Sequence, residues 1–533
     1  MGVFRQPANE SEDPPSMLLI HPPVTKPCEP PGGIGKLYGA LSHHGVKCKV
    51  LDCNIEGFLH LLTHPETPGE RIVEIQADTW GIRASRNLQN HLRLLRNRQG
   101  YHQIDRYKRA VRDLNHVLES KTRPEGVTLG LANYEDRGLS PVRSSDLIRS
   151  AEKPEKNPFY PYFRHRLLEL SESGGNPIVG FSLNYLSQAL CTFAMIGFLR
   201  REVPGLKIVL GGGLITSWMK RPRWHNPFRG LVDELIPGPG EDALLALNGV
   251  SEHISKTRYT PNYSLFPVMD YLAPGTILPY STSSGCYWNQ CSFCPERAEG
   301  NPYGPIPPEK ATTDLQTLVE ELKPSLIHIL DNAIPPALIK AMTDRPPGAP
   351  WYGFVRVTRH LTDPDFCRAL KRSGCILLKL GLESGDQRVL DGLQKGVDLG
   401  EASQVLKNLK EAGIATYVYL LFGTPEEDLL EARKTLDFVT NHHDQIHFLN
   451  LALFNMPMAD REVSPVESKE FYEGDLSLYV DFDHPKGWGR KKVRQFLDKE
   501  FKRHPAIASI LRRTPPVFTS NHAPFFVMGE GGT

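Results

Sequence analysis

Apolar and polar positions follow a regular order at the start of the chain. Met17 to His21 is a short apolar run followed by two prolines, which predicts a buried strand and its end. Lys36 to His44 has a helical pattern closed by a glycine, and Val46 to Asp52 alternates as a strand does. A strand, a glycine-rich turn, a helix and a strand form a βαβ unit. This unit predicts a parallel sheet with a right-handed crossover.

The same order returns after a long interruption. From about Ile55 to Leu170 the chain is rich in Arg, Asn, Gln and His and has helical patches, so we predict a helical insertion. The sheet pattern resumes from Pro177 to Asn184, and further strands are predicted at Leu206 to Leu210 and at Val232 to Ile236. Glycines follow these last two strands. Small residues after parallel strands gather at the carboxyl edge of a sheet, where open α/β folds bind ligands.

Strands and helices alternate again in the second half of the chain. The predicted strands are Gly275 to Tyr280, Leu326 to Leu330, Trp351 to Val357, Ile376 to Leu380, Ala415 to Leu421 and Gln445 to Leu453. Repeated βα units of this length predict a parallel barrel or partial barrel, whose functional site lies at the carboxyl ends of the strands.

The fold class expected from these patterns is α/β. We predict a mobile arm over residues 1–16, a Rossmann-like domain over 17–255 with a helical insertion at about 55–170, and a partial barrel over 270–460. Residues 461–533 contain a basic helix (Arg490 to Arg503) and the aromatic, proline-rich run Pro515 to Phe526. We predict that this tail caps the mouth of the barrel.

Composition narrows the function classes. The chain has 533 residues with 40% hydrophobic content, 23% charged content and a net charge of +1, which is typical of a soluble globular protein. This balance favours neither a nucleic acid nor a membrane as a partner. Met1 to Pro15 is polar, so we expect no secretory signal, and the longest apolar run, Ala189 to Leu199, is short for a membrane span. Three of the nine cysteines are clustered, which favours the reducing cytoplasm.

Three cysteines share one short loop after the first predicted barrel strand. Cys286, Cys291 and Cys294 are spaced Cys-x4-Cys-x2-Cys. Thiolates select soft metal centres, so an iron–sulfur cluster, zinc and Cu(I) are the candidates. A closed zinc site normally adds a fourth Cys or His, and no His follows within this loop. Three ligands on a [4Fe–4S] cluster leave one iron open, which favours catalysis. A zinc knuckle and three buried thiols without metal are the alternatives.

The loop resembles the signature of the radical S-adenosylmethionine (SAM) enzymes. Their usual spacing is Cys-x3-Cys-x2-Cys with an aromatic residue before the third cysteine; Phe293 fills that place, and the first interval here is one residue longer. The resemblance implies that the three cysteines hold a [4Fe–4S] cluster. It also implies that Glu383 and Ser384 hold the ribose or methionyl part of SAM and that Asp331 lies near the methionyl amine or the substrate. The residues expected around the adenine are Phe293, Phe422, Gly423 and Thr424.

The first domain is similar to the cobalamin-binding domain that precedes many radical SAM barrels. The likeness covers roughly residues 17–250 and is carried by Ile20-His-Pro-Pro, Gly180-Phe-Ser-Leu, Leu210-Gly-Gly-Gly and Asp233 with Gly238-Pro-Gly-Glu. The chain lacks the Asp-x-His-x-x-Gly motif that ligates cobalt, so the resemblance implies water or no protein ligand below the cobalt. His21, His43 and His44 are the alternatives. The implied cobalamin contacts are Ser182, Leu183, Asn184, Tyr185, Gly211, Gly212, Gly213, Gly238 and Glu241.

The two resemblances together imply a cobalamin-dependent radical SAM methyltransferase. Such an enzyme would act on an unactivated carbon of a small-molecule or peptide substrate through a 5′-deoxyadenosyl radical, with Asp331 and Glu383 as catalytic residues. Its electron donor would be of the flavodoxin or ferredoxin type, and a second SAM would supply the methyl group. Two alternatives stay open. One is a cobalamin-binding cyclase or rearrangement enzyme that transfers no methyl group, and the other is a non-catalytic iron–sulfur binding or electron-transfer protein.

Overall fold

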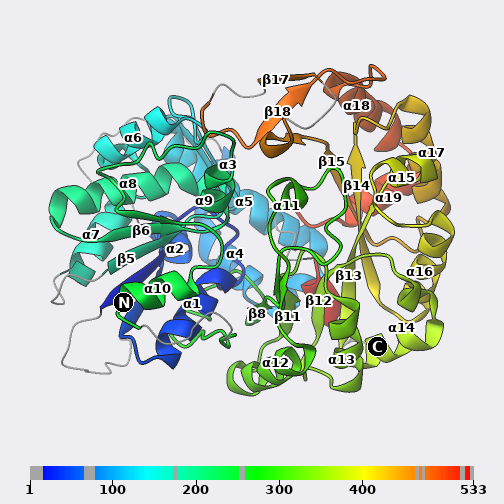
Figure 1. Ribbon diagram of the computed structural model, residues 1–533, viewed down its shortest axis with the longest axis horizontal. Coiled ribbons are helices and arrows are strands. Elements are labelled where there is room, and N and C mark those ends of the chain that lie inside the picture. The colour runs from blue at the N-terminus through cyan, green and yellow to red at the C-terminus, as the bar shows by residue number, and fades with distance from the viewer. Residues whose placement is uncertain are drawn as a thin grey trace.

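The computed structural model describes residues 16–64, 79–171, 178–250, 258–461, 467–470, 474–516 and 522–528. Two parallel sheets lie next to one another, one built from the first half of the chain and one from the second (Figure 1). Part of the C-terminal region forms a small antiparallel sheet above them in the same view. Residues 1–15 of the predicted arm lie outside the described residues. No helix among the described residues is long and apolar enough to cross a membrane.

The first sheet has five parallel strands in the order β2-β1-β5-β6-β7. They are β1 Met17–His21, β2 Cys48–Asp52, β5 Ile178–Ser182, β6 Ile208–Gly211 and β7 Glu234–Ile236. Its helices are α1 Gly32–His43, α8 Leu186–Glu202, α9 Gly213–Met219 and α10 Glu241–Leu247. The chain runs outward from β1 to β2 and then crosses to β5, so the strand order reverses between β1 and β5. The carboxyl ends of strands at such a point are where open α/β sheets bind ligands.

The helical insertion is present, with one difference. Its helices are α2 Cys53–Thr63, α3 Thr79–Arg86, α4 Leu88–Leu95, α5 Ile104–Thr122, α6 Ser144–Glu152 and α7 Tyr160–Ser171. A hairpin of β3 (Val127–Gly130) and β4 (Asn133–Asp136) also lies within it. The sequence did not predict this hairpin because its turn, Leu131-Ala132, lacks the Asn-Gly type of signal.

The second sheet has six parallel strands in the order β15-β14-β13-β12-β11-β8, and it confirms the predicted partial barrel. They are β8 Ile277–Tyr280, β11 Leu326–Ile329, β12 Trp351–Val355, β13 Cys375–Glu383, β14 Ala415–Phe422 and β15 Phe448–Leu453. Its helices are α12 Pro308–Leu322, α13 Pro336–Asp344, α14 Pro364–Arg372, α15 Gln387–Gly392, α16 Leu399–Glu411 and α17 Leu429–Asn441.

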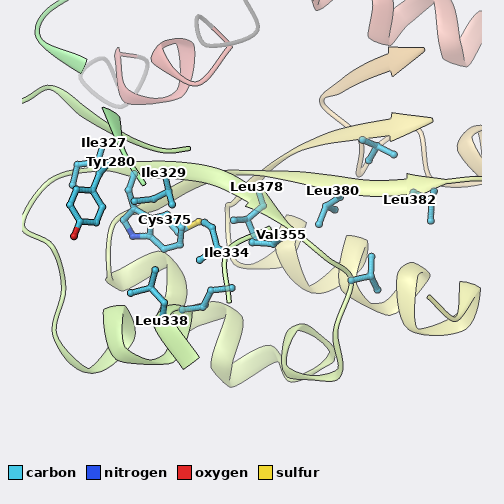
Figure 2. Packing of buried hydrophobic residues seen from close by; sticks show 14 of the residues in the cluster. Tyr280, Ile327, Ile329, Ile334, Leu338, Val355, Cys375, Leu378, Leu380 and Leu382 are labelled. Atoms are coloured by element: carbon cyan, nitrogen blue, oxygen red, sulfur yellow. The ribbon is translucent and has the colours of Figure 1, made fainter. Parts of the chain in front are cut away.

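Apolar side chains fasten the barrel helices to the outer face of this sheet. Leu378, Leu380 and Leu382 alternate along β13 and are almost fully buried, together with Ile334 and Leu338 (Figure 2). Each such side chain contributes about 1.5–3 kcal/mol when it is removed from water. Because side chains alternate along a strand, the residues between these leucines face the barrel interior.

Different parts of the C-terminal region pack against opposite ends of the barrel. The small sheet of β16 (Met456–Pro457), β17 (Ser468–Glu470) and β18 (Tyr479–Phe482) is followed by α18 (Arg490–Phe496) and a wider helical turn, Leu497–Phe501, in place of one long basic helix. Next come α19 Pro505–Arg513 and α20 Pro524–Met528.

The predicted cap is wrong for the last described residues. His522 and Phe526 contact Phe448, the first residue of β15, so this segment lies at the amino ends of the strands and not at the mouth. The difference arises because these aromatic residues complete a buried cluster with Tyr417 and Ala415 near the start of β14. Near the mouth, β16 and β18 pack through Met456 and Val480, and Phe293 of the cysteine loop joins them.

A buried carboxylate fastens the cap to the barrel. Glu427 is 1% exposed, and its Oε2 accepts hydrogen bonds from the Gly423 N–H (2.6 Å) and the Trp488 Nε1–H (3.0 Å). Burial raises the pKa of Glu427 to about 7, although these hydrogen bonds oppose the shift. The folded protein therefore holds a proton on Glu427 at pH values where the unfolded chain has released it.

We predict that Glu427 makes the folded protein less stable as pH rises from about 4.5 to above 7. The full loss is about 3 kcal/mol, because one pKa unit corresponds to 1.36 kcal/mol. Urea denaturation at pH 5 and pH 8.5 measures it, and Glu427→Gln should lose this part of the pH dependence. Equal pH dependence in the two proteins would contradict the prediction.

Candidate active site

The cysteine loop begins at the end of the first barrel strand. A short strand β9 (Ser283–Ser284) pairs with β10 (Gly304–Pro305) and presents Gly285 in the left-handed region, with φ of 69°. A Cβ atom there would lie 2.6 Å from the Pro302 carbonyl oxygen, so only glycine fits. The extra residue of the first cysteine interval falls in a segment where Asn289 has φ of 45°. Asparagine tolerates this left-handed conformation, which reverses the direction of the backbone within the lengthened interval.

The three cysteine thiols are half-buried neighbours, as a shared cluster requires. Burial raises the pKa values of the Cys291 and Cys294 thiols. Cys286 acts electrostatically on Cys291, and Cys291 acts in the same way on Cys294. Two groups of donors oppose the effect of burial: the cations Lys395 and Arg356 near Cys291, and the N–H groups of α11 (Pro295–Ala298) near Cys294. Cations and N–H donors around thiolates suit an anionic iron–sulfur cluster.

Among the described residues, no three Cys, His, Asp or Glu side chains converge on one point as the ligands of a single ion do. A [4Fe–4S] cluster makes no such demand, because each thiolate binds its own iron atom. The chemistry of the donors therefore fits the cluster that the sequence predicts.

Arg356 holds the loop against the barrel rim. Its guanidinium lies 3.8 Å from the centre of the Trp288 ring, and its Nη1 is 4.0 Å from the Cys291 sulfur. Arg356 also donates to the Lys395 carbonyl (2.5 Å), while the Trp288 indole donates to the Gln394 carbonyl (3.1 Å). Sequence reasoning missed Arg356, Lys395 and Trp288. Arg356 and Lys395 lie about 60 to 100 positions from the cysteines, and no local signal connects them.

Glu383 adopts a strained conformation at the rim. It ends β13 with φ of 70°, at an irregularity in the pairing with β14. Its Oε1 accepts a hydrogen bond from Lys395 Nζ at 2.8 Å, and both side chains are nearly buried. Gly381 leaves room for this pair, because a Cβ atom there would lie 2.8 Å from each of these two atoms. Non-glycine residues with positive φ concentrate at functional sites, which supports the choice of Glu383 as a site residue.

Removing Lys395 should destabilise the protein because it leaves the Glu383 carboxylate buried without its partner. We expect Lys395→Met to lower the free energy of unfolding by about 3–5 kcal/mol. Adding Glu383→Gln should restore a large part of that loss, which urea denaturation of the single and double variants measures. Lys410→Met, at an exposed pair with Asp444, is the control and should cost less than about 1 kcal/mol. A similar loss in both lysine variants would contradict this account.

Asp331 acts on the segment that leads to the cysteine loop. It is 4% exposed, and its carboxylate accepts hydrogen bonds from the Thr282 N–H and hydroxyl (both 2.8 Å) and from the Ser283 hydroxyl. Burial raises the pKa of Asp331, although these hydrogen bonds act in the opposite direction. The geometry gives Asp331 a positioning role toward the loop. Its expected contact with the methionyl amine or substrate stays a prediction.

The other predicted SAM contacts face different surroundings. Ser384 is fully buried, and its hydroxyl is engaged with Thr435 of α17 and with the Asp386 N–H. Phe422 packs under the cap against Phe501, and the Thr424 side chain is also fully buried. These three side chains therefore cannot reach a ligand in this conformation. Phe293 lies in the cysteine loop with Lys395 Nζ 5.5 Å from its ring centre, and Gly423 lies beside the cap residue Val493.

A large cavity lies between the carboxyl edge of the first sheet and the cysteine loop. Its volume is about 840 Å³, in the upper range of ligand pockets. Of the predicted cobalamin contacts, seven line it: Ser182, Asn184, Gly211, Gly212, Gly213, Gly238 and Glu241. Ser283, Ser284 and Gly285 line it from the other side. Leu183 is fully buried and Tyr185 is 60% exposed, and neither belongs to the lining.

The cavity fits a bulky ligand because its walls are small residues. Gly212 has φ of 107°, and a Cβ atom there would lie 2.4 Å from the Leu183 carbonyl oxygen. Lys36 and Glu241 form an ion pair of 2.7 Å in the wall. None of the three candidate histidines is in the lining. Burial lowers the pKa of His21 to about 3, and His43 and His44 pack on Tyr259.

Comparisons with known proteins agree with this geometry. Residues 280–439 match the family model of the Radical SAM superfamily. A 188-residue stretch is 26% identical to an uncharacterized methyltransferase of Pyrococcus horikoshii; it covers 33% of this chain and only 40% of that protein.

Two solved structures have a similar fold. The radical SAM methyltransferase TsrM from Kitasatospora setae, with cobalamin and a [4Fe–4S] cluster bound, matches with a TM-score of 0.51 at 15% identity, over 95% of this chain and 91% of that chain. The cobalamin-dependent SAM radical enzyme OxsB, with aqua-cobalamin bound, matches with a TM-score of 0.50 at 13% identity, over 82% of this chain and 53% of that chain.

The parallel partial barrel with its cysteine loop is thus a radical SAM domain. The matched segment contains Cys286, Cys291, Cys294, Asp331 and Glu383. Residues 280–439 thus match the Radical SAM superfamily, and the overall fold is similar to that of the cobalamin-dependent enzymes TsrM and OxsB.

Proposed function

We propose that the chain is a cobalamin-dependent radical SAM methyltransferase acting on an unactivated carbon. The observation that carries this proposal is the shared cavity. Seven of the nine predicted cobalamin contacts line one side of it, and Ser283 to Gly285, the residues directly before Cys286, line the other. A cobalamin in this cavity would therefore lie beside the cysteine loop.

The cofactors would supply the radical and the methyl group, and the chain's own residues would bind and orient them. Cys286, Cys291 and Cys294 would hold the cluster, with Arg356 and Lys395 offsetting its negative charge. Glu383, at the rim, would bind the ribose or methionyl part of SAM. The glycines after β6 leave room for the corrin ring and its nucleotide tail.

Methyl transfer and rearrangement leave different products from SAM. The test is anaerobic incubation of the reconstituted protein with SAM, a reductant and candidate substrates, followed by chromatography of the products. A methyltransferase of this kind should release both 5′-deoxyadenosine and S-adenosylhomocysteine. Release of 5′-deoxyadenosine with no S-adenosylhomocysteine would favour the hypothesis of a cyclase or rearrangement enzyme. If SAM stayed intact in the reduced protein, the hypothesis of a cluster-bearing electron-transfer protein would be favoured.

A further inference from the structure

A buried lysine lies inside the barrel, away from the rim. Lys379 is in the middle of β13, and its neighbours Leu378 and Leu380 point toward the helices, so Lys379 faces the interior (Figure 2). Its side chain is 6% exposed. It lies four residues before Glu383, which places it about 13 Å below the rim at the usual strand rise. A SAM molecule held at the cysteine loop would therefore lie above it.

Lys379 has few partners for a buried cation. Its Nζ contacts His328 Nε2 at 3.2 Å and lies 5.0 Å from the centre of the Tyr352 ring. An ammonium group has three N–H donors, and within the described part of the chain only this one hydrogen bond engages them. Within the same residues, Lys379 forms no ion pair with a carboxylate; Glu29, the acid that acts on it electrostatically, is paired with His328.

His328 is oriented from the other domain. Its Nδ1 lies 2.9 Å from a carboxylate oxygen of Glu29, which belongs to the loop between β1 and α1. The ring stacks on Tyr352 at 4.3 Å between centres. With its Nδ1–H donated to Glu29, the imidazole is neutral and presents Nε2 as an acceptor to Lys379. Glu29 thus acts on Lys379 through His328, and Glu29 and His328 are positioning residues.

The local charge favours an anionic ligand. Burial lowers the pKa of Lys379 to about 8, so at neutral pH it is still largely protonated. Glu29 supplies a negative charge that acts on Lys379, but its carboxylate is hydrogen-bonded to His328. Lys379 is therefore a buried cation with no ion pair among the described residues. A buried charge is costly unless it is paired, and a ligand with a negative group would supply the missing partner.

The surroundings favour an apolar or aromatic body next to that negative group. Phe354 and Tyr419 face one another at 4.6 Å between ring centres, and Tyr417 lies 4.8 Å from Tyr419. Phe354, Tyr419 and Asn450 are partly exposed although they lie on the face of the sheet opposite to the helices. The inner face of the barrel is thus accessible, with Phe354 and Tyr417 on the strands beside Lys379 and Tyr419 two residues nearer the rim.

We propose that Lys379, oriented by His328 and Glu29, binds a carboxylate or phosphate group of the substrate inside the barrel. This inference rests on the proposed function, because it assumes that the barrel holds the substrate of a radical reaction. It adds the class of that substrate, which is an anionic molecule with an apolar or aromatic body. The anionic end binds Lys379, and the remainder extends up past the aromatic rings toward the rim, where the radical would form.

Small probe molecules test this site without knowledge of the substrate. Binding of phenylacetate, phenyl phosphate and the neutral phenylacetamide to the full-length reconstituted protein can be measured by saturation-transfer difference NMR. We expect at least one anion to bind about 10-fold or more tightly than phenylacetamide, and the stronger anion distinguishes a carboxylate site from a phosphate site. Lys379→Met should abolish the preference for the anion. Lys410→Met, which changes an exposed lysine, should keep it, and Lys379→Arg should restore it.

Several results would overturn the inference. Equal binding of acid and amide by the unaltered protein would do so even if the variants failed to fold. An anion preference that survives in Lys379→Met would also do so. Loss of SAM binding in Lys379→Met would be a third such result, because it would assign the lysine to the SAM site. Equilibrium dialysis with labelled SAM measures it.

The two proposals can fail separately. Anion preference without any cleavage of SAM would leave the Lys379 site standing and refute the proposed function. SAM cleavage with methyl transfer but without anion preference would do the reverse.

Discussion

Replacing Cys294 with alanine should reduce formation of 5′-deoxyadenosine from SAM by more than about 100-fold. That factor is the upper end of what loss of an outer partner of a metal ligand costs, and Cys294 would be a ligand itself. The thiol lies among donors suited to a thiolate, namely the N–H groups of Glu296 and Arg297. Anaerobic reconstitution followed by iron analysis and product chromatography measures the effect.

Cys48 offers a matched control. It is also a half-buried cysteine, but it lies in the first sheet, and its thiol donates to the Lys49 carbonyl. Cys48→Ala should therefore retain iron and activity. If Cys294→Ala kept a full complement of iron and cleaved SAM at the unaltered rate, the cysteine trio would not be the cluster site.

Replacing Gly33 with tryptophan should lower the affinity for cobalamin by about 100-fold or more, which corresponds to about 2.7 kcal/mol. Gly33 lines the cavity, no atom lies within 4 Å of a Cβ atom built there, and its φ is not positive. The backbone therefore accepts a side chain, and the indole ring occupies space that the corrin would need. Binding of hydroxocobalamin, followed by its visible spectrum, measures the change.

Gly33→Ala is the control for this variant. Its single methyl group leaves the cavity open and favours helix α1 slightly, so cobalamin binding should be unchanged. Iron content should be the same in all three proteins, since the cysteine loop is untouched. Undiminished cobalamin binding by Gly33→Trp would place the cofactor elsewhere.

The alternation of strands and helices made most of the fold predictable from the sequence. Both predicted parallel sheets are present, and the glycines after β6 and β7 line a cavity at the edge of the first sheet. The cysteine loop was equally easy to predict, because its three cysteines are close in sequence. Such features depend on periodicity and on local spacing, and the sequence displays both directly.

Features that depend on long-range contacts were not predictable. Arg356 and Lys395 meet the cysteine loop only because β12 and the segment after α15 end at the same rim. Glu29 reaches His328 from another domain, and His522 turns back to the amino ends of the strands. Ser384 shows the reverse case: it follows Glu383 in the motif, but its side chain points into the protein toward Thr435.

The account depends on one cavity that brings cobalamin next to a [4Fe–4S] cluster. Anaerobic purification with hydroxocobalamin supplied, followed by metal analysis and visible spectra, tests this most directly. We predict about four iron atoms and about one cobalt atom per chain, with the spectra of both cofactors in one protein. Iron without cobalt would contradict the role of the cavity, and cobalt without iron would contradict the role of the three cysteines.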